Sequence, residues 1–154
     1  MDFARINPKA VAEIPATYSV EYEGEQVFNG IENKPLKIDF YGLDSDAGKR
    51  ATAKLAKKLD RAGTKSIANM TEEQIILRAK RHQGMIAELY GELVHGWENI
   101  PDFSGKRKAD GSYPPLPFTK ENAVRLFSEA EWMAAGIEDF LAERRKTLLD
   151  PETT

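Results

Sequence analysis

The sequence of 154 residues contains no cysteine. This absence excludes disulfide frameworks, zinc sites with cysteine ligands, iron–sulfur clusters and thiol nucleophiles, and it fits a reducing cytoplasm. No apolar run approaches the roughly 18 residues that a membrane-spanning helix needs. The first five residues, MDFAR, lack the apolar block of a secretory signal. We therefore expect a cytoplasmic protein without membrane contact.

Histidine is almost as scarce, because only His82 and His95 occur. His82 falls on the apolar stripe of a predicted helix, which favours a core or half-buried histidine over a catalytic base. His95 lies near the predicted end of that helix, where an imidazolium would interact well with the helix dipole. The sequence has no G-x-S-x-G elbow, H-E-x-x-H pair, EF-hand loop, P-loop or dinucleotide fingerprint. We expect no enzyme, and no catalytic, cofactor-binding or metal-binding residues.

An excess of positive charge is also missing, since 22 basic and 25 acidic residues give a net charge of -3. Such a chain has no global attraction for nucleic acid or for an anionic membrane. The segment Lys49–Lys65 carries seven Lys and Arg residues, but no aromatic side chains alternate with them as they do in single-strand binders. A solvated helix face is the favoured interpretation of this segment, and also of the triplet Lys106–Lys108.

The fractions of hydrophobic residues (41%) and charged residues (31%) are those of an ordinary globular protein. Residues 1–15, which contain two prolines, predict an irregular N-terminal arm. Residues 16–41 contain two alternating segments, Tyr18–Tyr22 and Leu36–Phe40, separated by turn-like residues. They predict a small antiparallel β element at the start of a single domain that spans residues 16–149.

Helical periodicity replaces this alternation after Gly42, and the segment 42–45 offers an N-cap. Residues 46–62 predict an amphipathic helix that ends at Gly63. Residues 71–95 predict a long helix that begins with a capping box from Thr71 to Gln74. Gly84 and Gly91 lie inside this second helix, where glycine often permits the close approach of another helix.

Residues 97–117 predict a long loop that is rich in proline and aromatic residues. A helix over 119–127 follows, with Thr119 as its cap, and a second capping box at Ser128–Glu131 predicts a new helix over 129–148. Residues 150–154 form a tail. The predicted fold class is therefore α+β: mainly α, with a small N-terminal antiparallel β element and a helical domain of three to four helices.

Aromatic residues are concentrated around the long loop and its neighbouring helices: Trp97, Phe103, Tyr113, Phe118, Phe127 and Trp132. They could fold back over the core, or they could line a partner-binding groove, since aromatic residues dominate interface hot spots. Composition alone favours the first interpretation.

These segments resemble the tail assembly chaperones of tailed bacteriophages. The similar motifs are LVHGWENI at 93–100, LPFTKENA at 116–123, and Trp132 followed by a closing amphipathic helix. The upstream strand, the GLDSD segment at 42–46 and the basic helix after it are also similar to the N-terminal half of that family. The resemblance covers about residues 18–147 and is closest over 93–141. The loop between Ile100 and Leu116 departs from it, being longer and more basic.

The resemblance implies a non-enzymatic assembly factor of the host cytoplasm that is absent from the mature virion. It implies binding to the tape measure protein, recruitment of tail tube protein and, in many phages, a longer frameshifted form. Self-association stays open. A chaperone of this kind needs an apolar groove, which the stripes of the helices 71–95 and 129–148 could form or could bury against each other. The partner-binding residues expected on these stripes and at the loop ends are Ile86, Leu89, Tyr90, Leu93, Trp97, Phe118, Trp132, Met133, Ile137 and Phe140.

Two other classes of function stay open at this point. One is a structural virion component, such as a head–tail connector or a tail completion protein. The other is a nucleic-acid-binding regulator that uses the helix within Lys49–Lys65, although the charge balance disfavours nucleic acid.

Overall fold

A three-stranded antiparallel sheet organises the fold of the computed structural model, which describes residues 6–30, 33–62, 67–103 and 106–146. Strand β4 (Lys37–Phe40) lies in the centre, between β1 (Ala16–Ser19) and β5 (Val94–Glu98). Residue Ile38 pairs with Tyr18 on one side and with Trp97 on the other. The long sequence separation of β4 and β5 means that the chain must leave the sheet, build a helical hairpin and return.

A small β-hairpin follows β1. Strand β2 (Glu21–Tyr22) pairs with β3 (Glu25–Gln26) across a turn in which Glu23 and Gly24 both have positive φ angles, 52° and 82°. Two consecutive positive φ angles match the twist of the flanking strands and are typical of a tight hairpin turn. The predicted antiparallel β element is confirmed.

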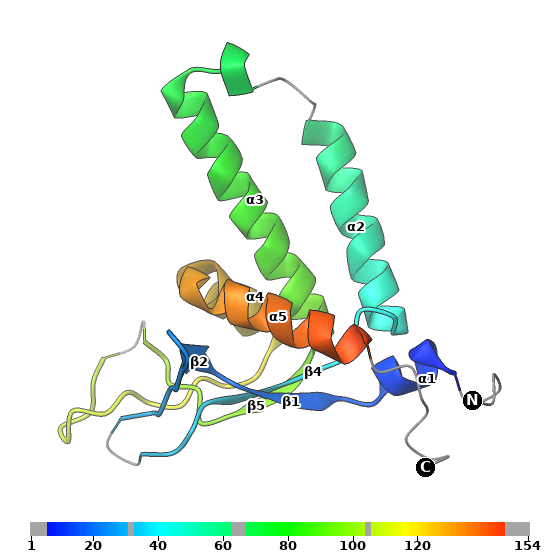
Figure 1. Cartoon of the computed structure of the whole chain (residues 1–154). Helices are drawn as coiled ribbons and strands as arrows, with labels where there is room; N and C mark the ends of the chain where they lie inside the picture. Colours follow the sequence, from blue (N-terminus) through cyan, green and yellow to red (C-terminus); the bar gives the residue numbers. More distant parts are fainter. Residues whose placement is uncertain (1–5, 31–32, 63–66, 104–105, 147–154) are drawn as a thin grey trace.

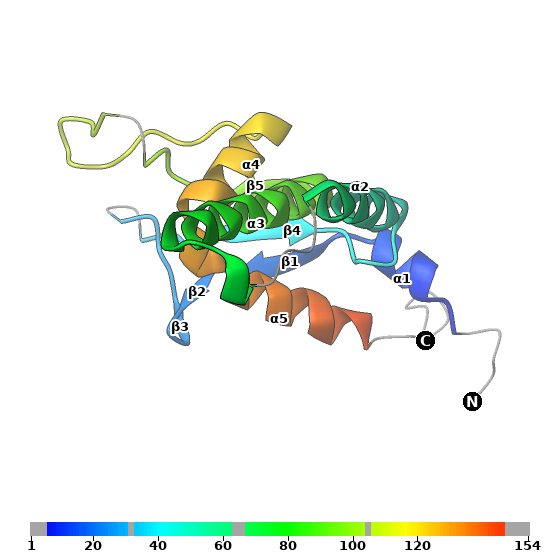
Figure 2. The ribbon, with the colours of Figure 1, turned by 90° about the horizontal axis from the view of Figure 1, so that it is seen from above.

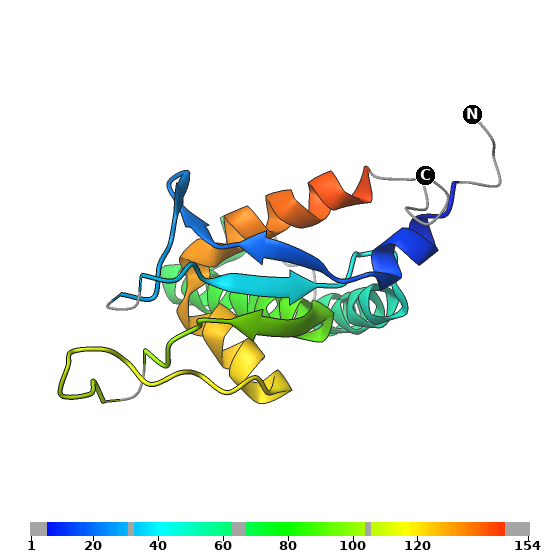
Figure 3. The same cartoon turned by 90° about the horizontal axis from the view of Figure 1, so that it is seen from below.

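All the longer helices lie on one face of the three-stranded sheet (Figures 2 and 3). Seen from below, the three strands stand in front of the helices (Figure 3). The helical elements after β4 are α2 (Asp46–Ala62), the 3-10 turn η2 (Ile67–Asn69), α3 (Glu72–Leu93), α4 (Lys120–Glu129), the 3-10 turn η3 (Glu131–Met133) and α5 (Ala134–Arg145). The fold is therefore α+β, as predicted. Among the described residues, no helix is both long and apolar enough to span a bilayer.

The core lies between the sheet and the helices α3, α4 and α5. Strand β4 alternates half-buried and buried residues, so that Ile38 and Phe40 both point into the core and are fully buried. The helices complete it with side chains that include Leu93, Met133 and Ile137. The period-two pattern of β4 thus decides which of its residues face the helices.

The predicted helix starts are confirmed at three places. Ser45 caps α2, where its Oγ accepts a hydrogen bond from the amide of Gly48 at 3.0 Å. The capping box of Thr71 and Gln74 starts α3, with both reciprocal hydrogen bonds present. The hydroxyl of Thr119 accepts from the amide of Asn122 and starts α4. The predicted stop at Gly63 lies outside the described residues.

One of the two glycines inside α3 permits the predicted close approach. A Cβ atom at Gly91 would lie 2.7 Å from Cγ2 of Val124 on α4, whereas a Cβ atom at Gly84 would meet nothing within 4 Å. Helices α3 and α4 therefore cross closely at Gly91. At Gly84 the same helix faces open space.

Residues 1–15 were predicted to be irregular. This prediction is wrong for residues Pro8–Glu13, which form helix α1. Asn7 caps this helix through its side chain, and Pro8 occupies the first helical turn, a position that proline favours. The apolar segment 11–14 was too short to reveal a helical period. Packing stabilises this short helix, since Val11 and Ala12 are buried.

Two boundaries around the long loop are also corrected. Residues Val94–Glu98 form strand β5, not the end of a helix and the start of a loop, because they pair with β4 along its length. His95 therefore caps no helix; its Nδ1 lies 2.9 Å from the hydroxyl of Tyr41. His82 is exposed, which contradicts its prediction as a core or half-buried residue.

The second predicted capping box is absent. Helix α4 continues to Glu129, and the hydroxyl of Ser128 donates to the carbonyl of Val124 within it. The chain then passes through η3, and α5 begins at Ala134 without a side-chain cap. A serine hydroxyl can bond to a carbonyl four residues earlier inside a helix as well as cap a helix start, so the four-residue pattern did not place this boundary.

Candidate functional site: the helical arm

Helices α2 and α3 form a hairpin that stands away from the sheet (Figure 1). Two ion pairs join them, one between Lys54 and Glu92 at 2.7 Å and one between Lys58 and Glu88. Beyond these pairs the two helices diverge toward the free end of the hairpin, where the start of α3 reaches further from the sheet than the end of α2 (Figure 1). We call α2 together with residues 72–83 of α3 the arm.

The free end of the arm exposes large apolar side chains. Every residue from Thr71 to Gln83 is exposed. Within this segment Ile75, Ile76 and Leu77 are 37%, 50% and 54% exposed, and Leu59 on α2 is 47% exposed. We call these four residues the arm tip. Single exposed apolar residues are common on proteins, but three in succession on one helix are a signal of an interaction surface.

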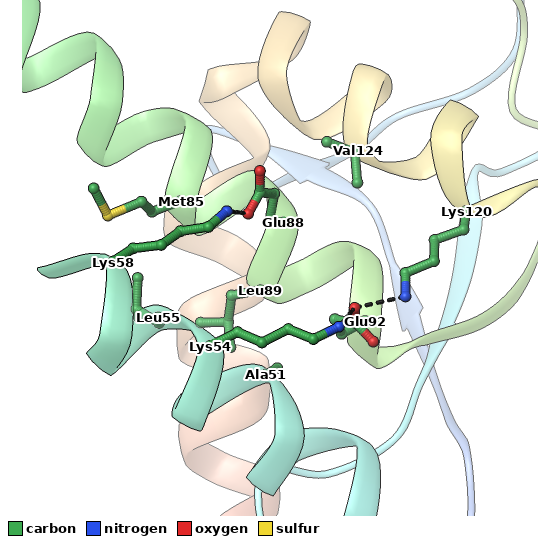
Figure 4. A pocket seen from close by; sticks show the side chains of 10 residues that line it. All are labelled: Ala51, Lys54, Leu55, Lys58, Met85, Glu88, Leu89, Glu92, Lys120 and Val124. Carbon is green, nitrogen blue, oxygen red and sulfur yellow. Dashed lines mark hydrogen bonds and ion pairs between the residues drawn. The ribbon is translucent and has the colours of Figure 1, made fainter. Parts of the chain in front are cut away.

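A groove of about 300 Å³ runs between α2, α3 and the start of α4. Its floor is apolar, formed by Ala51 and Leu55 from α2, Met85 and Leu89 from α3, and Val124 from α4. Charged side chains lie among these residues: in the close view the pairs Lys58–Glu88 and Lys54–Glu92 cross from α2 to α3, and Lys120 reaches Glu92 from α4 (Figure 4). The groove therefore combines apolar and ionic side chains, close to the base of the arm.

Glu92 is the central charge of this groove. Its Oε1 accepts from Nζ of Lys54 at 2.7 Å and from Nζ of Lys120 at 2.5 Å, so that one carboxylate joins α2, α3 and α4. Burial alone would raise its pKa, but the hydrogen bonds and charges of Lys120 and Lys54 outweigh that effect. The pKa of Glu92 therefore lies below its ordinary value, and the carboxylate stays charged at neutral pH.

A segment that contains most of the arm differs from the rest of the chain in charge. Residues 49–81 contain ten of the 22 basic residues and three of the 25 acidic ones, which gives this segment a net charge of +7. The remaining twelve basic and 22 acidic residues give the rest of the chain a net charge of -10. The small overall charge thus conceals a strongly asymmetric molecule, in which the segment that carries the apolar arm tip has a positive net charge, although Glu72 and Glu73 begin α3.

Most of the predicted partner-binding residues belong to the core. Tyr90, Leu93, Met133 and Ile137 are buried. Four others are only partly buried and pack against the core: Ile86, Leu89, Trp97 and Phe140. Burial, together with the charge of Glu138, raises the pKa of Tyr90 to about 12. The stripe of α5 and the second half of the α3 stripe are therefore buried in the shared core with the sheet and α4. Of the predicted set, Leu89 lines the groove.

Phe118 and Trp132 are the exposed members of the predicted set, at 44% and 40%. Phe118 meets Trp97 edge to face, with ring centroids 4.9 Å apart, and the indole Nε1 of Trp97 donates to the carbonyl of Leu116 at 2.9 Å. These contacts hold the two ends of the long loop together. Trp132 packs edge to face on Tyr22 of β2, at 5.6 Å.

The long loop is a surface element with its own small aromatic cluster. Phe103 and Tyr113 lie edge to face at 5.5 Å, and the guanidinium of Arg107 lies 5.1 Å from the centre of the Tyr113 ring. Lys106 and Lys108 are exposed, which fits their prediction as solvated residues. Within the described part of the chain, no group of three or more His, Asp and Glu side chains could hold a metal ion.

The sequence contains the apolar run of the arm tip, but helical periodicity did not identify this run as exposed. Ile75 and Ile76 fall on the apolar stripe predicted for the helix over 71–95, which could form a groove or be buried. Because successive helical residues are about 100° apart, the run Ile75-Ile76-Leu77 covers about 200° of the helix surface, which one packed face cannot accommodate. That width is the signal that could have marked this segment as exposed.

The comparisons with known proteins leave the family open. No protein-family model matches the chain, and neither the curated proteins nor the solved structures include a significant match.

Proposed function

We propose that the protein is a non-enzymatic assembly chaperone of the tailed-phage type, which binds the tape measure protein through its arm. The observation that carries this proposal is the exposed run Ile75-Ile76-Leu77 on a helix that extends beyond its neighbour. A helix with uncovered apolar side chains suits the binding of another amphipathic helix. The sequence resemblance over 93–141 supplies the client class, because tape measure proteins are long and helical. In this proposal the protein also brings tail tube subunits to the tape measure protein in the host cytoplasm, and it is absent from the finished virion.

The groove supports the same proposal. It continues the apolar surface of the arm toward α4 through Leu55, Met85 and Leu89, and the charged side chains among them keep this surface dissolved in water. A bound client helix could therefore lie along the arm from its tip to its base. Ordering such a client on a preformed surface costs less than ordering both partners at once.

The test is co-expression with the tape measure protein of the same phage, followed by affinity pull-down and a measurement of tape measure solubility. The unaltered chain is expected to form a complex and to increase solubility. The double substitution Ile76→Ser and Leu77→Ser is expected to weaken the complex at least about tenfold, since it removes two exposed anchors. Phe103→Ser is the matched control, because Phe103 is 49% exposed on the loop, outside the arm.

Two results would contradict the proposal. If the unaltered chain forms no complex and does not increase solubility, the function is wrong. If the arm-tip variant binds as well as the Phe103→Ser variant, the chaperone function survives but the arm is not its binding site. Mass spectrometry of purified virions adds a further check, because a stoichiometric amount of the chain would indicate a structural virion component.

The net charge of +7 on residues 49–81 favours nucleic-acid binding as a second candidate. Lys49, Arg50 and Lys57 are exposed on α2. One observation disfavours binding to single strands: the sequence between Tyr41 and Tyr90 contains no Phe, Tyr or Trp on which bases could stack. Binding to DNA or RNA that falls steeply with salt, and that is lost on charge reversal of Lys49 and Lys57, would support this candidate.

A further inference from the structure

A second apolar surface lies on the body, opposite in charge to the arm tip. Tyr22 is 53% exposed and Trp132 is 40% exposed, and their rings meet edge to face. Glu21, Glu23 and Glu25 of the β2–β3 hairpin are all exposed, as is Glu131 beside Trp132. In the register of the hairpin, Glu25 lies directly across from Tyr22. We call these six residues the acidic patch.

The acidity of this region is a property of two long segments of the chain. No Lys or Arg occurs between Lys9 and Lys34, or between Arg125 and Arg144, whereas each of these segments contains five acidic residues. Together they account for the whole net charge of -10 outside residues 49–81. Strands β2 and β3 come from the first segment, and η3 and α5 from the second, so contact between β2 and η3 brings the two segments together.

We infer that the arm tip of one copy docks on the acidic patch of a second copy, head to tail. Each surface offers exposed apolar side chains in a part of the chain whose net charge has one sign, and the two signs are opposite. Complementary potentials of this kind steer association and fix its orientation. The inference goes beyond the proposed function: in the absence of a client, the acidic patch of a neighbouring copy covers the arm tip, and a bound client competes with that neighbour.

The two surfaces do not meet within one copy. The arm tip lies at the far end of the arm, whereas β2 and η3 belong to the body beside the sheet (Figure 1). A contact between them must therefore join different molecules. Since the two surfaces are unlike, the contact is heterologous and can repeat along a chain of copies. Both surfaces are small, so the association is expected to be weak and to depend on protein concentration.

The experiment uses sedimentation velocity of the full chain and of two variants over a range of protein concentrations. Variant one carries Ile76→Ser and Leu77→Ser in the arm tip. Variant two carries Glu21→Lys, Glu23→Lys and Glu25→Lys in the acidic patch. All five side chains are exposed, and circular dichroism checks that both variants keep the fold. Phe103→Ser serves again as the exposed control outside both surfaces.

The unaltered chain and the control are expected to form dimers and larger species as concentration rises, and added salt should weaken this association. Each variant alone is expected to associate at least about tenfold more weakly. A mixture of the two variants should form one-to-one dimers and nothing larger, because each keeps the surface that the other lacks.

Other outcomes would overturn the inference. An unaltered chain that stays monomeric at every concentration shows that the two surfaces do not bind each other. Continued association of variant two alone indicates a symmetric contact between arm tips, and continued association of variant one alone indicates contact between acidic patches. A mixture that does not dimerise, although both variants are folded, also excludes the head-to-tail contact. None of these measurements involves a tape measure protein, so their failure is distinct from failure of the proposed function.

Discussion

The two halves of α3 lie in contrasting environments. Residues 72–83 are exposed throughout, although they include Ile75, Ile76 and Leu77. Residues 84–93 pack beside α4 and contain the buried residues Ala87, Tyr90 and Leu93. One continuous helix thus belongs to the core at one end and to the solvent at the other. Helical periodicity alone does not distinguish a helix face that is buried in the core from one that is exposed for binding, because both have apolar residues at the same spacing.

The largest effect is expected from equal truncations in the two halves. Leu93→Ala should reduce the free energy of unfolding by about 2–5 kcal/mol, since it leaves a cavity in a fully buried site. Leu77→Ala should change it by no more than about 0.5 kcal/mol, since the side chain is 54% exposed. Urea unfolding followed by circular dichroism measures both. Comparable losses would show that the first half of α3 is packed in solution.

Arg144 joins the ends of the body and is expected to give the next largest effect. Its guanidinium donates to the carbonyls of Phe40 at 2.5 Å and Val11 at 2.8 Å, and also to that of Ile14, so that α5 holds β4 and α1 together. Its partial burial lowers its pKa from the ordinary value. Arg144→Met should cost about 2–3 kcal/mol of unfolding free energy, because these carbonyls lose a charged donor.

The neighbouring Arg145 is the matched control for that change. It is exposed and forms one ion pair with Asp44 at 3.2 Å, so Arg145→Met should alter stability by less than about 1 kcal/mol. Thermal unfolding of both variants makes the comparison. Equal shifts in melting temperature would contradict the role assigned to Arg144.

The two glycines of α3 test the same contrast by addition of a methyl group. Gly91→Ala should destabilise the protein by about 1–3 kcal/mol, because its Cβ would lie 2.7 Å from Cγ2 of Val124. Val124→Ala in the same chain should recover part of this loss. Gly84→Ala should instead stabilise the protein by about 0.5–1 kcal/mol, since alanine favours the helix and the site is open. Denaturant unfolding of these three variants and the unaltered chain measures the effects. The same sign at both glycines would be inconsistent with the described packing.

The smallest effect is expected where the arm joins the body, at Glu92. The pKa of its carboxyl is lowered from 4.5 in the folded state, so its ion pairs stabilise the fold above about pH 4.5 and are lost as the pH falls below that value. Glu92→Gln should cost less than about 1 kcal/mol at pH 7, and the difference from the unaltered chain should shrink as pH falls through this range. Unfolding free energies measured over a range of pH give the difference.

Glu143→Gln is the control and should show no change, since both members of the Glu143–Lys146 pair are more than 70% exposed. A difference for Glu92→Gln that does not depend on pH would contradict the assignment.

Local sequence patterns predicted where helices begin better than they predicted which strands pair and which residues are buried. The caps Ser45, Thr71 and Thr119 were predictable because each is a hydrogen bond between residues three positions apart. Strand β5 was not, because its hydrogen-bond partner β4 lies more than 50 residues earlier in the chain. The candidate site shows the same limit: Leu89 was expected in a binding surface and lines the groove, whereas Tyr90 and Leu93 were expected there and are buried.

The sequence by itself determined the α+β class, the bounds of α2 and the start of α3, because alternation, helical period and caps act over a few residues. It also contained the charge asymmetry between residues 49–81 and the rest of the chain. Only the tertiary structure decided which apolar stripes are core and which are surface. That decision depends on the register between α2 and α3 and on the close crossing of α3 over α4 at Gly91. Burial is a property of pairs of elements, so no single segment of the sequence specifies it.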